Sequence, residues 1–223
     1  MPFEPGERLK YSLRWNIVPA GEAVLEVLPM KSINGIQVYH FRMTAESNSF
    51  VDIFYKVRDL IDSYADNKMT HSVRYLKKQH EGNTKRNVSV ELDWNNNTAY
   101  YKDEKKSETT KLLPGAFDPL GILYYSRILL SMGNESVQRP VTDGSKCIQG
   151  RASIIKRERI EVASGSYDTL LLEPEMEHIG GVFEKSKGAK IKVWVTADHR
   201  FIPVKIASKV VVGSFVAELV AIE

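Results

Sequence analysis

Residues 118–134 read DPLGILYYSRILLSMGN, and this stretch decides the fold because the period of the sequence changes here. Asp118-Pro119 is typical of a helix start, with an N-capping carboxylate followed by proline at the first helical position. Apolar residues then follow without a sustained polar face as far as Met132, and Gly133-Asn134 supplies a C-terminal cap. The stretch predicts one helix at about 118–132 that must be covered nearly all round.

The segments on both sides of this helix alternate apolar and polar residues, which is the two-residue period of a half-buried strand. Leu9 to Ile17 alternates, turn residues follow at 18–21, and alternation resumes at 23–27. The same pattern predicts strands at 39–45, 55–66, 72–79, 85–94, 98–102, 137–147, 151–163, 166–174, 190–196, 203–212 and 214–223. The polar stretch 102–111 indicates an exposed loop or ragged hairpin end. The stretch 174–190 indicates a long connection that is functional or simply mobile.

Together these elements predict a mainly β fold, with a curved antiparallel sheet or half-open β-barrel wrapped around the helix. We expect about 10–12 strands and one β-rich domain over residues 1–223, because all-β domains often reach this length. The hydrophobic fraction of 43% and the charged fraction of 26% are those of a globular chain with a core to bury.

Composition also limits the partners of the chain. The formal net charge of +3, from 31 basic and 28 acidic residues, is too small and too dispersed for a nucleic-acid surface. No apolar run approaches the ~20 residues of a membrane-spanning helix, so we expect a protein that is peripheral to a membrane at most. The first residues, 1–13, lack the regions of a signal peptide, and an exported protein would therefore be represented here by its mature part.

Three segments resemble a bacterial family known as domain of unknown function 3108. They are GERLKYSLRWNIVPAGEAVLEV at 6–27, FDPLGILYYSR at 117–127 and IKVWVTADHRFIPVKIASKVVVGSFVAELV at 191–220. The resemblance implies an exported, periplasmic envelope protein of Gram-negative bacteria, with an antiparallel β architecture similar to the lipoprotein-carrier half-barrels. It implies no reaction. The positions that match the family pattern are Gly6, Glu7, Tyr11, Trp15, Ala20, Gly21, Asp118, Pro119, Tyr125, Arg127, Pro203 and Gly213.

The sequence contains no readable signature of a metal, cofactor or nucleophile site. The five histidines, at positions 40, 71, 80, 178 and 199, show no metal-binding spacing. A GxSxG motif is absent, and the glycine pair at 180–181 has no phosphate-loop context. We therefore assign no catalytic residue, no metal and no cofactor from the sequence.

Three neighbouring aspartates, Asp59, Asp62 and Asp66, leave an enzyme hypothesis open. Paired carboxylates can divide acid and base roles when their environments separate their pKa values. On a strand, Asp62 and Asp66 share one face and Asp59 points to the other. The alternative interpretation is a solvated strand end that enters a turn.

Arg127 stands out because it interrupts an apolar helix, where an unpaired guanidinium would be costly. It must reach the surface, pair with a carboxylate such as Asp62, or meet the anionic head group of a ligand.

From this pattern we expect the concave face of the sheet to bind or carry a hydrophobic or amphipathic envelope ligand such as a lipid. The proposed ligand-binding residues are Trp15, Tyr64, Tyr124, Tyr125, Arg127 and Asp62. Two alternatives remain open. One is a cell-wall-active hydrolase that uses the clustered aspartates, and the other is a non-catalytic protein-interaction module with an exposed edge strand or apolar patch.

Overall fold

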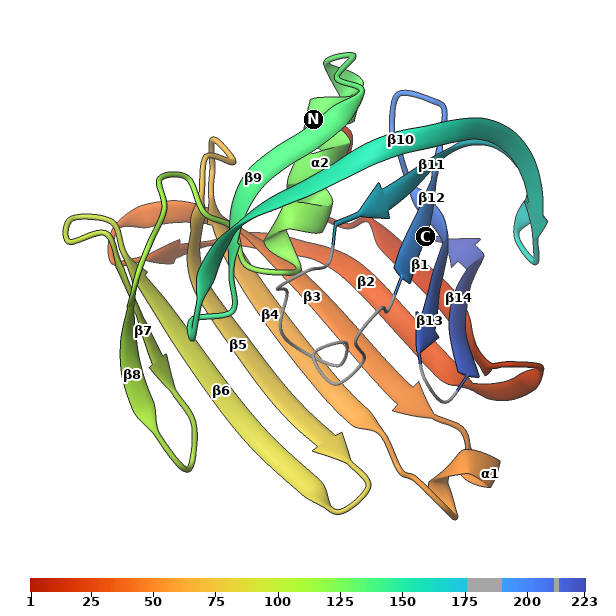
Figure 1. Cartoon of the computed structure of the whole chain (residues 1–223), viewed down its shortest axis with the longest axis horizontal. Helices are drawn as coiled ribbons and strands as arrows, with labels where there is room; N and C mark the ends of the chain where they lie inside the picture. The colour runs from red at the N-terminus through yellow and green to blue at the C-terminus, as the bar shows by residue number, and fades with distance from the viewer. Residues whose placement is uncertain (176–189, 211–212) are drawn as a thin grey trace.

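The computed structural model describes residues 1–175, 190–210 and 213–223, which form one antiparallel sheet of fourteen strands and two helices (Figure 1). The helices are α1 (Ser49–Asp52) and α2 (Gly121–Ser131). The strands are β1 (Arg8–Trp15), β2 (Val18–Ile33), β3 (Ile36–Ser47), β4 (Arg58–Asp66), β5 (Ser72–Glu81), β6 (Thr84–Asp93), β7 (Thr98–Lys102), β8 (Ser107–Lys111), β9 (Ser136–Thr142), β10 (Cys147–Val162), β11 (Gly165–Pro174), β12 (Lys190–Thr196), β13 (Pro203–Val210) and β14 (Gly213–Ile222).

The sheet consists of two meanders joined by the first and last strands. Its order is β8-β7-β6-β5-β4-β3-β2-β1-β14-β13-β12-β11-β10-β9, so β1 pairs with β14 and the sheet ends at β8 and β9 without closing into a barrel. Figure 1 shows it curving around α2. This confirms the predicted class, a curved antiparallel sheet with a central helix.

Several details differ from the sequence prediction. The described residues contain fourteen strands instead of 10–12, and part of the predicted polar loop at 102–111 is the edge strand β8. An edge strand needs no apolar face, so alternation cannot reveal it. The strand predicted at 55–66 begins only at Arg58, after the short helix α1. Residues 176–189 of the predicted connection lie outside the described part of the chain.

The central helix begins at Gly121, three positions after the predicted start at Asp118, and Asp118 holds its first turn. Its Oδ1 accepts hydrogen bonds from the backbone N–H groups of Leu120 and Gly121, both at 2.9 Å. Its Oδ2 accepts hydrogen bonds from Ser63 and Ser72 of the sheet, both at 2.6 Å. A Cβ at Gly121 would lie 2.9 Å from Ser72 Oγ, so glycine permits this close approach. The carboxylate therefore fixes the helix start to β4 and β5.

The main core lies between α2 and the face of the sheet that is turned toward it, which we call the inner face. Tyr124 stacks on Phe41 of β3 with ring centroids 3.9 Å apart, and Phe3 meets both rings edge to face. Phe41, Phe3 and Tyr124 are buried, as are Leu9 and Leu219 of the two strands that join the meanders. The helix is thus covered by aromatic and aliphatic side chains. Separately, no helix in the described residues is long and apolar enough to cross a bilayer.

Candidate functional site

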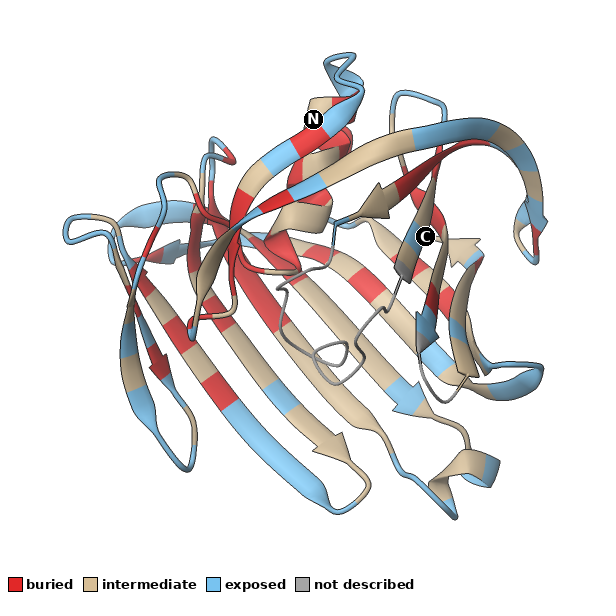
Figure 2. Cartoon of the chain, in the orientation of Figure 1, coloured by how far each residue is buried: buried red, intermediate tan, exposed pale blue. Residues whose placement is uncertain are grey.

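The helix covers only part of the inner face. An 11-residue helix rises about 16 Å, whereas the 12 residues of β3 extend over roughly 40 Å. Figure 2 shows the buried segments of β3 to β6 beside α2, and less buried segments toward the other end of these strands. We call that other end, which carries the β1–β2, β3–β4, β5–β6 and β13–β14 connections, the rim.

Side chains on the inner face form rows, with one residue from each neighbouring strand. The row beside α2 is buried and consists of Val27, Phe41, Ser63, Tyr75, Val90 and Tyr101. In the next row toward the rim, Leu25 and Val88 are buried, whereas Met43, Ile61 and Lys77 between them are only half-buried. Half-buried apolar side chains on the inner face are available for contact with a ligand, and we take this part of the face as the candidate site.

Carboxyl groups gather on the β4–β5 side of the candidate site. Asp59 lies near Glu81, and its Oδ1 accepts a hydrogen bond from the His80 backbone N–H at 3.0 Å. Burial and the neighbouring Asp59 carboxylate raise the pKa of Glu81, although Lys77 and Gln79 act in the opposite direction. Burial also lowers the pKa of Lys77. These groups form a polar cluster that can hold protons or a charged head group.

A second polar network continues the cluster toward the sheet edge. Arg86 Nε lies 3.2 Å from Asp103 Oδ2, and the Tyr101 hydroxyl donates to the same oxygen at 2.6 Å. Burial and this hydrogen bond raise the pKa of Tyr101 to about 12. Because the three groups are hydrogen-bonded to one another, they hold a fixed arrangement at this side of the site.

The opposite wall of the candidate site is apolar. Leu13 of β1 pairs with Ala217 of β14, which pairs with Ile206 of β13, and all three are half-buried. Ala23 of β2 and Met43 of β3 connect this wall to the polar cluster. The site is therefore amphipathic, with apolar side chains on one side and titratable groups on the other.

Arg127 pairs with Glu7 and not with Asp62, which corrects the partner suggested from the sequence. Its Nη1 and Nη2 donate to the two Glu7 carboxylate oxygens at 2.6 and 2.8 Å. Its Nη2 also donates to the carbonyl of Pro2, and its Nε to that of Arg200. The guanidinium is fully buried and joins the N-terminal segment to α2. Its contacts are those of a structural ion pair.

The other proposed ligand-binding residues lie in three separate places. Tyr124 is buried against Phe41, and Tyr125 is buried on Phe117 with its hydroxyl bonded to Arg139. Tyr64 and Asp62 belong to the outer face, and Trp15 is exposed at the rim. The structure does not bring these residues together at one site, and their role in ligand binding stays a prediction.

The sheet divides the aspartate cluster as strand alternation predicts, with Asp62 and Asp66 on one face and Asp59 on the other. Asp62 is buried on the outer face, where His40 Nε2 and Arg42 Nε approach its Oδ1 at 2.6 and 2.8 Å. Burial opposes ionisation, but these hydrogen bonds lower the pKa of Asp62 to about 2. Asp66 accepts backbone N–H groups in the β4–β5 turn. Only Asp59 faces the candidate site, where it accepts from the His80 backbone N–H and lies near Glu81.

Sequence reasoning missed Glu81, Lys77 and the apolar wall. The signal was present in β5, because Tyr75, Lys77, Gln79 and Glu81 occupy alternate positions and so share the inner face. The charged side chains of Lys77 and Glu81, on the face opposite to Leu76, are also typical of a solvated strand face. Among the described residues, no group of three or more His, Cys, Asp or Glu side chains could hold a metal ion.

Comparison with known proteins supports the fold and gives the family. A solved β-barrel-like protein of domain of unknown function DUF1849 from Brucella abortus has a TM-score of 0.62 to this chain at 10% identity, with 97% of this chain and 96% of that chain covered. A protein with a YmcC-like fold from Bacteroides fragilis has a TM-score of 0.38 at 9% identity, with 100% and 98% covered. No curated protein matches the chain. The family model described as "Protein of unknown function (DUF3108)" matches residues 10–220, and the chain belongs to this family.

Proposed function

We propose that the protein binds an amphipathic envelope molecule such as a lipid on the half of the inner face that α2 leaves uncovered. The observation that carries this proposal is the group Met43, Ile61 and Lys77, which is half-buried although the two residues that flank it in the same row, Leu25 and Val88, and the adjacent row beside α2 are buried. A core row in a filled barrel would be buried like its neighbour. The periplasmic location implied by the family resemblance is part of the proposal.

The two walls of the site suggest how such a ligand is oriented. An acyl chain fits against Leu13, Ile206 and Ala217, where burial of apolar surface favours binding. Its polar head group then lies toward Lys77 and the Asp59/Glu81 pair. Arg127 has a structural role in this arrangement, because its ion pair holds α2 in place.

Binding of a fluorescent NBD-labelled phospholipid tests the proposal. Replacement of Ile61 with aspartate puts a charge among the apolar contacts, and we expect the affinity to fall at least ~tenfold. Leu60 is also half-buried but faces outward on the same strand, so Leu60→Asp is the matched control and should bind normally. Circular dichroism establishes that both variants fold. Equal binding by the two variants would refute this site.

The Asp59/Glu81 pair favours a second function, hydrolysis of a cell-wall glycan or peptide. Two neighbouring carboxyls can hold one proton between them, which provides an acid and a base. The Glu81→Gln variant should lose all hydrolysis of purified cell wall. Absence of hydrolysis by the parent protein across pH 4 to 8 would exclude this function.

A further inference from the structure

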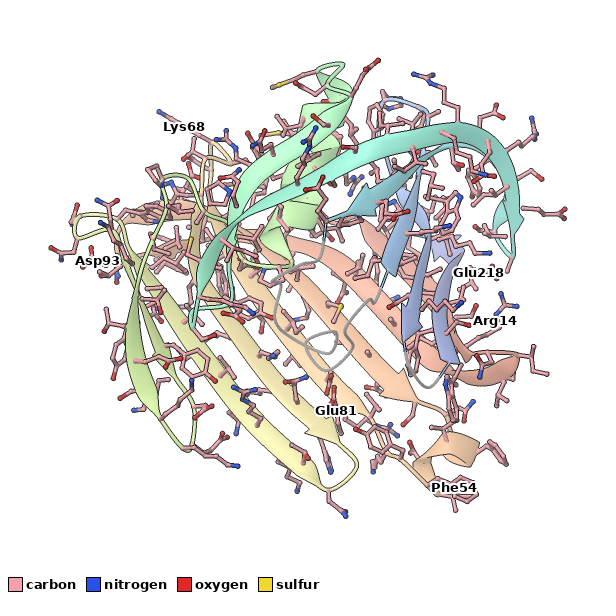
Figure 3. All side chains as sticks on the ribbon, in the orientation of Figure 1. Arg14, Phe54, Lys68, Glu81, Asp93 and Glu218 are labelled. Atoms are coloured by element: carbon pink, nitrogen blue, oxygen red, sulfur yellow. The ribbon has the colours of Figure 1, made fainter. Side chains whose placement is uncertain are left out.

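Exposed apolar side chains gather at the rim. Of the six aromatic residues that are exposed in the described part of the chain, five lie there: Trp15, Phe50, Phe54, Tyr55 and Phe215. Ile17 and Phe54 are the most exposed of these apolar side chains, with 91% and 77% of their surface accessible. Figure 3 labels Phe54 on the connection after α1, where it points away from the sheet. Such a concentration on one end of a molecule marks an interaction surface.

Hydrogen bonds join the three turns that carry these side chains. Asn48 donates from its backbone N–H to the Ala20 carbonyl and from its side chain to the Pro19 carbonyl, which ties the α1 segment to the β1–β2 hairpin. Asn16 donates to the Ser214 carbonyl and accepts from its N–H, which ties that hairpin to β14. The apolar side chains are therefore presented together on a fixed framework.

An ion pair holds α1 against the sheet. Arg58 donates to both Asp52 carboxylate oxygens, at 3.1 and 2.6 Å, and to the Ser47 carbonyl at 3.0 Å. The four-residue helix cannot be stable by itself, so this contact maintains the projection of Phe50 and Phe54.

We propose that the rim docks on a lipid bilayer, with the side chains at the turn tips inserted at the membrane interface. The aromatic side chains form two clusters on separate segments, with Trp15 of β1 stacked on Phe215 of β14 and Phe50 edge to face with Phe54 beside α1. A fluid surface can contact both clusters without matching their shape. Aromatic side chains beside lysines are typical of segments that anchor proteins at the membrane interface. Here the exposed Lys56 and Lys209 lie next to the aromatic residues Tyr55 and Phe215. These lysines match the negative charge of lipid head groups.

The rim also lies beside the candidate ligand site. The Tyr55 ring covers Gly82, where an added Cβ would lie 2.8 Å from the ring, and the backbone of Gly82 donates to the Lys56 carbonyl. Tyr55 is close enough to Glu81 and Asp59 for their charges to help burial raise its pKa. Docking at the rim would therefore bring the uncovered half of the inner face to the bilayer. The docking proposal does not depend on ligand binding there.

Vesicle flotation tests the docking surface. Vesicles of phosphatidylethanolamine and phosphatidylglycerol should carry the parent protein upward, and the Ile17→Ser/Phe54→Ser variant should partition at least ~tenfold less because two large apolar side chains are removed. The matched control is Ile36→Ser/Met132→Ser, which removes two exposed apolar side chains elsewhere and should float like the parent. Lipids brominated on their acyl chains should quench Trp15 fluorescence, and Trp15→Phe should abolish this part of the quenching.

Three outcomes would overturn the proposal. They are failure of the parent to float, equal flotation of the rim and control variants, or self-association of the parent that the rim variant abolishes without any vesicle binding. Binding of the NBD-labelled phospholipid by the rim variant separates the two proposals. A variant that binds this lipid but no longer floats supports docking, and a parent that floats without binding it would refute only the ligand site.

Discussion

Replacement of Glu7 with alanine should be among the most damaging single changes in the chain. The substitution removes both oxygens that accept from Arg127 and leaves a guanidinium whose side chain is only 1% exposed without its counter-charge. Breaking a buried ion pair from one side costs about 3–5 kcal/mol. In a chain of this size each kcal/mol lowers the melting temperature by about 2–4 °C, so a fall of roughly 6–20 °C is expected.

Thermal and urea unfolding followed by far-ultraviolet circular dichroism measures this cost. Glu4→Ala is the control, because Glu4 is exposed on the same segment and should change the free energy of unfolding by less than ~0.5 kcal/mol. The Glu7→Ala/Arg127→Met double variant should recover part of the loss, since methionine fills the space without a charge. A loss below ~1 kcal/mol in Glu7→Ala would refute the structural assignment of Arg127.

Three further predictions concern buried polar groups. Tyr124→Phe should leave stability unchanged or raise it, because the Tyr124 hydroxyl is buried without a hydrogen-bond partner. Tyr11→Phe should lower stability by about 1 kcal/mol, because its hydroxyl donates to the Pro203 carbonyl at 2.7 Å. Urea unfolding measures both variants, and equal free energies of unfolding for Tyr124→Phe and Tyr11→Phe would contradict the reasoning. Asp62, with a folded pKa of about 2 against 3.8 for an ordinary aspartate, stabilises the fold above pH 5 and loses this contribution as the pH falls toward 2. Unfolding titrations should show an acid-dependent loss of about 1–2 kcal/mol in the parent that Asp62→Asn lacks, and identical pH profiles would contradict it.

Local patterns in the sequence predict much of the architecture. Alternation at Leu9 to Ile17 locates β1, and Asp118-Pro119 locates the start of α2 to within three residues, because both signals depend on neighbouring residues alone. The short helix α1 and the polar edge strand β8 have no such periodicity. Their conformation depends on contacts such as the Arg58–Asp52 pair, which forms only when the chain has folded.

The candidate site was harder to predict because it depends on long-range pairing. Glu7 and Arg127 are 120 positions apart, and Asp59 meets Glu81 only through the register of β4 and β5. Strand alternation shows that two of the three aspartates share a face, but it does not show which face turns toward the helix. Which face turns toward the helix depends on how the whole sheet is assembled, with β1 beside β14.

Native mass spectrometry of the protein purified from a Gram-negative periplasm, with lipid analysis of the extracted ligand, tests the central claim most directly. We predict one bound amphipath per chain. It should be lost in Met43→Glu, which places a charge on the uncovered inner face, and kept in Thr44→Glu, which changes the adjacent outward-facing position. A ligand-free mass for the parent that stays unchanged when lipids are added would contradict the account.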